Sequence, residues 1–94
     1  MKISTHEDGN LLTLQVEGRV IGDWAAELER FWNSFHPLLG ARKLRLDLCG
    51  VVYVDCHGKQ ILQQIFAATG AEILADSPLT KQFASEVRQM TIGD

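Results

Sequence analysis

The chain has 94 residues, of which 46% are hydrophobic and 22% charged, and its formal net charge is −3. These values are typical of one globular domain, so we expect a single domain over residues 1–94. The slight negative charge argues against a nucleic-acid partner or an anionic membrane surface, because both are negatively charged and bind mainly basic proteins.

The sequence also argues against a membrane or secreted protein. No apolar run approaches the ~20 residues that a transmembrane helix needs. The N-terminal segment MKISTHEDGN lacks an apolar core, so we expect neither a signal peptide nor membrane insertion. Two cysteines are too few for a disulfide framework, which indicates free thiols and a cytoplasmic location.

The N-terminal part of the chain predicts a β-hairpin. Residues 2–6 predict a short strand, and EDGN at 7–10 is a turn signal, because Asp-Gly and Gly-Asn pairs tolerate positive φ. In the segment 11–20 apolar and polar residues alternate. This period of two is typical of a strand with one buried face.

A first helix is predicted to begin at Asp23, whose carboxylate would serve as the N-cap. Large apolar residues then recur at helical spacing and predict one stripe that faces the core. The stripe consists of Trp24, Leu28, Phe31, Trp32 and Phe35. Pro37 and Gly40 mark where the helix is expected to end.

The segment KLRLDL at 43–48 alternates again. A strand covered by helices on both faces would be apolar throughout. We therefore expect a sheet with helices mainly on one face and the other face largely in water. The short apolar run VVYV at 51–54 follows, and then the loop DCHG at 55–58.

The second half of the chain predicts two further helices around a fourth strand. One amphipathic helix is expected from Gly58 to the residue before Gly70, a natural C-cap. The segment AEILA at 71–75 predicts a strand. Pro78, preceded by an Asp-Ser pair with capping oxygens, suits the first turn of a last helix. The order β-β-α-β-α-β-α predicts an α/β (α+β) fold on a mixed four-stranded sheet.

The neighbouring thiol and imidazole of Cys56 and His57 raise the question of catalysis or metal binding. A cysteine nucleophile needs a base within hydrogen-bond reach, but adjacent side chains diverge, and His6 and His36 lie far away in the sequence. A zinc site from Cys49, Cys56 and His57 would lack the paired short spacings of zinc ligands. We expect no catalytic residues, no metal and no cofactor, and hence a non-enzymatic function.

A redox-sensitive thiol at Cys56 is an alternative. Cys56 precedes a helix whose free N–H groups favour an anion, and His57 beside it can carry a positive charge. Both effects lower the pKa of a cysteine, whereas the negative charge of Asp55 opposes them. The sequence therefore leaves open a thiol redox sensor.

The sequence LRLDLCGVVYVDCHGKQIL, preceded by LTLQVEGRV and followed by GAEILADSPLTKQFASEV, resembles the STAS family of anti-sigma-factor antagonists and their relatives. The resemblance extends from about Leu11 to Val87. It rests on the order and spacing of a strand, a short apolar run, Asp-x-x-Gly and a helix, then a glycine-led strand and a Ser-Pro helix start. It implies a STAS-like fold and a bacterial cytoplasmic signalling protein that binds another protein, such as an anti-sigma factor with kinase activity.

In that family a serine or threonine follows the Asp, and its phosphorylation by the partner kinase ends binding. The resemblance places Asp55 and Gly58 at matching positions, Cys56 at the phosphoacceptor position and His57 at the position of a small residue. Because a thiol is not a substrate for a serine kinase, we expect the phosphorylation switch to be absent.

The resemblance also implies where a partner binds. Antagonists often have Gly-Glu-x-Asp after the second strand, whereas this chain has GRVI, so Arg19 reverses one charge and Ile21 removes another. The implied binding surface is the loop 55–58 with Lys59, Arg19 and Ile21. A regulatory subunit of a lipid-trafficking ABC transporter is a further alternative that the resemblance allows. The resemblance specifies neither the partner nor an oligomeric state.

Overall fold

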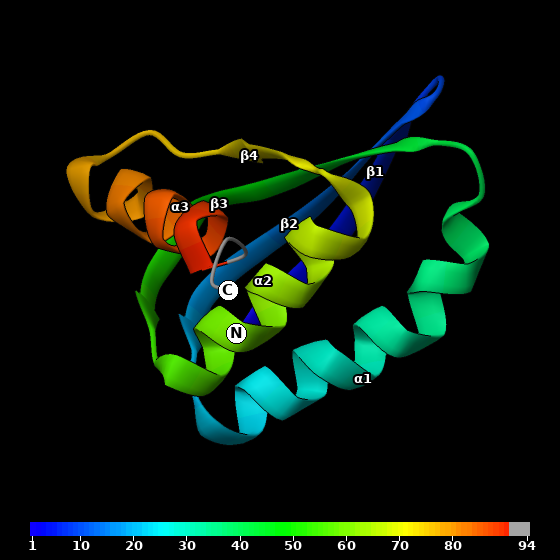
Figure 1. The fold of residues 1–94 in the computed structure, drawn as a ribbon. Coiled ribbons are helices and arrows are strands. Elements are labelled where there is room, and N and C mark those ends of the chain that lie inside the picture. The colour runs from blue at the N-terminus through cyan, green and yellow to red at the C-terminus, as the bar shows by residue number, and fades with distance from the viewer. Residues whose placement is uncertain (91–94) are drawn as a thin grey trace.

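The computed structural model describes residues 1–90 and has a four-stranded sheet with the helices mainly on one face (Figure 1). The elements are β1 (Lys2–Asp8), β2 (Leu11–Val20), α1 (Gly22–Leu39), β3 (Lys43–Val54), α2 (Cys56–Thr69), β4 (Glu72–Leu74) and α3 (Pro78–Met90). The strand order is β1-β2-β3-β4, in which β1 is antiparallel to β2, and β2, β3 and β4 are parallel. The predicted element order and fold class are confirmed.

The core lies between the sheet and the helices. The alternating residues of β2 and β3 place leucine and valine side chains on the face that the helices cover, and α2 adds its own apolar stripe. These buried residues include Leu12, Leu14, Val16, Leu44, Leu46, Leu48, Ile61, Leu62 and Ile65. The intervening residues, such as Thr13 and Arg45, stay partly exposed on the opposite face. Within residues 1–90, no helix is both long and apolar enough to cross a bilayer.

β3 is one continuous strand of 12 residues, and it includes both the predicted strand at 43–48 and the short apolar run at 51–54. Its register against β2 shifts twice, near Gly50 and near Val52. Each shift places an extra residue in β3, as in a β-bulge. The bulges interrupt the alternation of faces, and as a result Val52 and Tyr53 are both exposed although they are neighbours.

The start of α1 differs from the prediction. Its N-cap is Ile21, which makes no side-chain capping bond, and Asp23 lies inside the first turn. The prediction of Asp23 as the N-cap is therefore wrong. A negative charge in the first turn still interacts favourably with the helix dipole.

The apolar stripe of α1 is narrower than predicted. Leu28 and Trp32 are buried, and Phe31 and Phe35 pack against the edge of the core. Trp24, however, is 46% exposed, compared with 4% for Trp32. The assignment of Trp24 to the core is therefore wrong.

The predicted helix ends are largely confirmed. α1 continues through Pro37 to Leu39 with Gly40 as its C-cap, and α2 ends at a left-handed Gly70. The first turn of α3 is capped reciprocally, because the Thr80 N–H donates to Ser77 Oγ at 3.1 Å and the Ser77 N–H donates to Thr80 Oγ1 at 3.0 Å.

Gly58 determines how closely α2 approaches the end of β2. A Cβ atom at this position would lie 2.2 Å from the carbonyl oxygen of Val20 and 2.8 Å from Cγ1 of Val54. The carbonyl belongs to the backbone of a paired strand and cannot move aside cheaply. Only glycine therefore fits at this position.

We predict that Gly58→Ala lowers the free energy of unfolding by about 3 kcal/mol, because the added methyl overlaps the backbone of β2. Gln60→Ala is the matched control, since Gln60 is exposed on the same helix and its truncation should change stability by less than about 0.5 kcal/mol. Urea unfolding of both variants measures the difference. Equal stability of the two variants would show that α2 has room to shift.

Candidate functional site

The predicted site residues gather at the edge of the sheet where β2 and β3 end. The two strands are parallel, and Arg19 and Val20 pair with Tyr53 and Val54 at their C-terminal ends. Both strands then lead directly into helices, so the starts of α1 and α2 lie side by side (Figure 1). The structure therefore brings together the loop 55–58 and the segment after β2.

The carboxylate of Asp55 joins the two helix starts. Its Oδ1 accepts a hydrogen bond from the Gly58 N–H at 2.7 Å, and its Oδ2 accepts one from the Gly22 N–H at 2.9 Å. The first bond is the N-cap of α2, and it moves the start of this helix to Cys56, two residues before the predicted start. Gly22 has a positive φ of 49°, which glycine adopts without strain at this junction.

These bonds also determine the ionisation of Asp55. Hydrogen bonds from the N–H groups of Gly58 and Gly22, in that order, hold the pKa of the Asp55 carboxyl below its ordinary value of 3.8. The group is thus an ionised acceptor at neutral pH. A general base works best with a pKa near the operating pH, so Asp55 is suited to holding the loop and poorly suited to proton transfer.

Cys56 and His57 lie beside this bridge, at the start of α2. Cys56 is exposed. His57 is directed at α1, where its Nε2 lies 3.9 Å from Oε1 of Glu29. No hydrogen bond joins the thiol to the imidazole in the part of the chain that the structure describes. The other two histidines are elsewhere, since His36 stacks on Trp32 with the ring centroids 4.6 Å apart and His6 lies on the edge strand β1.

Lys59 links the first turn of α2 to α3. Its Nζ lies 3.0 Å from Oε1 of Glu86. A partly exposed pair of this kind contributes about 0–1 kcal/mol to stability, so its main effect is to orient the two side chains. The ammonium group of Lys59 is directed at α3 as a result.

Cys49 is separate from this site. It lies within β3, and its N–H donates to Asp47 Oδ1 at 2.9 Å. Desolvation, reinforced by a hydrogen bond to Asp47, raises the pKa of the Cys49 thiol to about 11. Among residues 1–90, no three histidine, cysteine or acidic side chains are grouped so as to hold a metal ion.

The sequence reasoning missed three exposed apolar side chains near this loop. Val52 and Tyr53 are 57% and 54% exposed, and Trp24 is 46% exposed. Exposed apolar groups that gather on a surface often mark an interaction site. A signal for Trp24 existed, because Ala25, Leu28 and Trp32 form the fully helical spacing i, i+3, i+7 and leave Trp24 at the border of that stripe.

Comparison with known proteins supports the fold. Neither the protein-family models nor the curated proteins include a match. A crystal structure of a protein named Mglu aligns with 80% of this chain at a TM-score of 0.58 and 17% identity. A crystal structure of Mglu in its native form aligns with 79% at a TM-score of 0.47 and 18% identity. The chain spans only 19% and 22% of those two chains.

We predict that the stabilising contribution of Asp55 depends on pH in the acid range. Because its pKa is lower in the folded state than in the unfolded chain, its contribution is fully present above its ordinary pKa of 3.8 and is lost as the pH falls through the folded-state pKa. The melting temperature of the wild type should exceed that of Asp55→Asn at neutral pH, because an amide has a single accepting oxygen and cannot accept hydrogen bonds from both Gly58 and Gly22 in the same way. The difference should shrink as the pH is lowered below 3.8.

Asp23→Asn is the control for this titration, because Asp23 lies in the first turn of α1 without a capping bond. At neutral pH its melting temperature should fall less than that of Asp55→Asn, because Asp23 contributes only through the helix dipole. A difference in melting temperature between the wild type and Asp55→Asn that does not change with pH would contradict the role of the Asp55 charge.

We also predict that the two thiols differ in their rate of alkylation, because Cys56 is exposed and the Cys49 thiol has a raised pKa. At pH 8 only about one Cys49 thiol in a thousand is ionised, given its pKa of about 11. Iodoacetamide should therefore label the exposed Cys56 first, and Cys56→Ser should lose the fast phase while Cys49→Ser keeps it. Mass spectrometry over time measures the rates. Faster labelling of Cys49 would show that the sheet face around it opens.

Proposed function

We propose that the chain is a STAS-type regulatory module that binds a protein partner without catalysis and without control by serine phosphorylation. The contact is made by the surface around the end of β2 and β3, which we term the docking surface. It comprises Arg19, Ile21, Val52, Tyr53, Cys56 and His57. We expect the protein to act in the cytoplasm, on a partner such as an anti-sigma factor or another regulatory protein.

The observation that carries this proposal is that the Asp55 carboxylate binds the starts of both helices, α1 and α2. Both of its oxygens bind backbone N–H groups, one from each helix start. The charged group of the loop is thus used to hold the surface rigid. A preorganised surface loses little conformational entropy when a partner binds.

The composition of the docking surface supports the same proposal. Tyr53 and Val52 are apolar groups that are accessible from solvent, and Arg19 is exposed on the neighbouring strand. Tyrosine and arginine are enriched in protein–protein interfaces. An exposed thiol at Cys56 completes the surface with a small, weakly polar group.

The thiol at Cys56 also bears on regulation. In the resembled family, phosphate at this position places a dianion in the interface, and repulsion and desolvation then oppose binding. Cys56 has a comparable volume to serine but offers no hydroxyl to a kinase. We propose that binding is controlled by the amounts of the two proteins.

A thiol sensor is the second candidate, and the exposure of Cys56 is the observation that favours it. Oxidation of Cys56 would then replace phosphorylation as the signal that ends binding. Slow alkylation with an ordinary pH profile at Cys56 would count against this candidate.

We predict that Cys56→Glu weakens partner binding about tenfold or more and preserves the fold. A glutamate at the first residue of α2 interacts favourably with the helix dipole, but it adds bulk and charge to the docking surface. The measurement is quantitative capture from a lysate of the source organism with the tagged protein. The captured amount of at least one protein should be about tenfold or more lower with Cys56→Glu than with the wild type. A tenfold change corresponds to about 1.4 kcal/mol of binding free energy.

Gln82→Glu is the matched control, because it adds the same charge at an exposed position of α3. It should retain the partner at the wild-type level, and both variants should melt near the wild-type temperature. The proposal fails if every captured protein binds Cys56→Glu and Gln82→Glu equally.

A further inference from the structure

We propose that the outer face of α1 binds one positively charged side chain of a protein partner, an arginine or a lysine, between Trp24 and Glu27. The inference rests on the proposed function, because it names a partner contact next to the docking surface. It concerns a part of the chain that lies outside the residues implied by the family resemblance.

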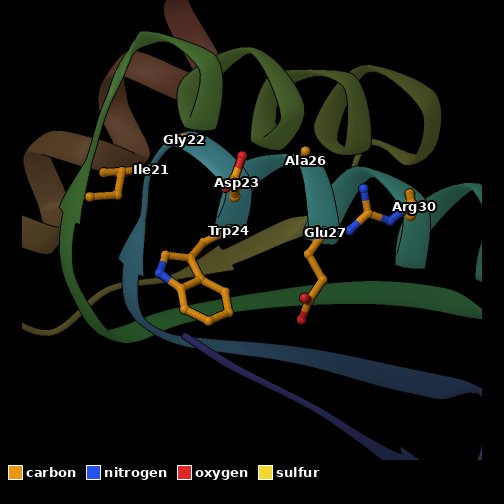
Figure 2. A pocket seen from close by; sticks show the side chains of 7 residues that line it. All are labelled: Ile21, Gly22, Asp23, Trp24, Ala26, Glu27 and Arg30. Carbon is orange, nitrogen blue, oxygen red and sulfur yellow. The ribbon is translucent and has the colours of Figure 1, made fainter.

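The outer face of the first half of α1 is hollowed (Figure 2). The residues that line the hollow are Ile21, Gly22, Asp23, Trp24, Ala26, Glu27 and Arg30. The hollow is continuous with the docking surface, since Ile21 belongs to both and the Gly22 N–H is bonded to Asp55. A partner seated on the loop would therefore reach the start of α1.

The side chains of Trp24 and Glu27 project to the same side of α1, away from α2 (Figure 2). Trp24 is 46% exposed although the same helix buries Trp32, so its indole does not serve the core. An aromatic face attracts a cation, and a carboxylate beside it adds an ion pair. A guanidinium group suits both, because it stacks on aromatic rings and hydrogen bonds to carboxylates.

The charges around the hollow favour a cation at its Trp24 end. Neither Asp23 nor Glu27 has an ion-pair partner among residues 1–90. The helix dipole compensates the negative charge of Asp23, which lies in the first turn. The effect of the dipole falls off beyond that turn and does not compensate the charge of Glu27. The charge of Glu27 is thus available to a ligand.

Arg30 limits what the hollow accepts. It lines the end of the hollow farther along α1, and it forms no ion pair with Glu27. Its positive charge repels a second cation at that end. The hollow is therefore suited to a single basic side chain rather than to a polybasic segment.

The test uses two capped peptides, acetyl-Ala-Arg-Ala-amide and the same peptide with uncharged citrulline in place of arginine. Each is titrated at millimolar concentration into the isotope-labelled protein, and the indole N–H signals of Trp24 and Trp32 are followed by NMR. The arginine peptide should shift the Trp24 signal and leave that of Trp32 unchanged. It should bind at least about threefold more tightly than the citrulline peptide.

Glu27→Gln should remove this preference for arginine, and Glu29→Gln is the matched control, because Glu29 is on the same helix but faces His57 of α2. Equal responses to the two peptides, or an equal effect of the two variants, would overturn the inference. The proposed function fails by a different result, namely capture that is insensitive to Cys56→Glu, so the two failures are distinguishable.

Discussion

One carboxylate holds together the parts of this protein from which a partner surface can be built. Asp55 accepts a hydrogen bond from Gly58 in its own helix and another from Gly22, which is 33 residues away in the sequence. The second bond fixes the start of α1 against the start of α2. Gly58 complements the arrangement by allowing α2 to contact the carbonyl of Val20. The positions of the loop, of Ile21 and of the hollow on α1 all follow from these contacts.

Two ionisable groups of this part of the fold, Asp55 and Cys49, have pKa values far from neutral pH. Asp55 is kept ionised by backbone N–H groups, whereas the pKa of Cys49 is raised to about 11 by desolvation and Asp47. Neither group exchanges protons near neutral pH. His57 is turned toward Glu29 rather than toward Cys56. The end of the sheet also carries exposed apolar groups, Val52 and Tyr53.

Local patterns in the sequence were sufficient for the elements and for their order. The alternation in β2 and the Ser77 cap of α3 depend only on neighbouring residues, and the structure confirms both. The start of α1 could not be predicted in this way, because the group that binds Gly22 comes from Asp55 across the fold. The continuity of β3 was hidden for a related reason, since its bulges interrupt the period of two. At the candidate site, the sequence pattern assigned Trp24 to the core, whereas it is exposed, because helical spacing alone does not show where an apolar stripe ends.

The central claim is that a single charge serves both helix starts, and an NMR titration tests it directly. Amide protons that donate to a carboxylate shift as that carboxylate is protonated. The account predicts that the amide protons of Gly22 and Gly58 follow the Asp55 side-chain carbon with one common midpoint, below the ordinary value of 3.8. A Gly22 amide that does not respond at this midpoint, while that of Gly58 does, would contradict the account, because Asp55 would then be no more than the cap of its own helix.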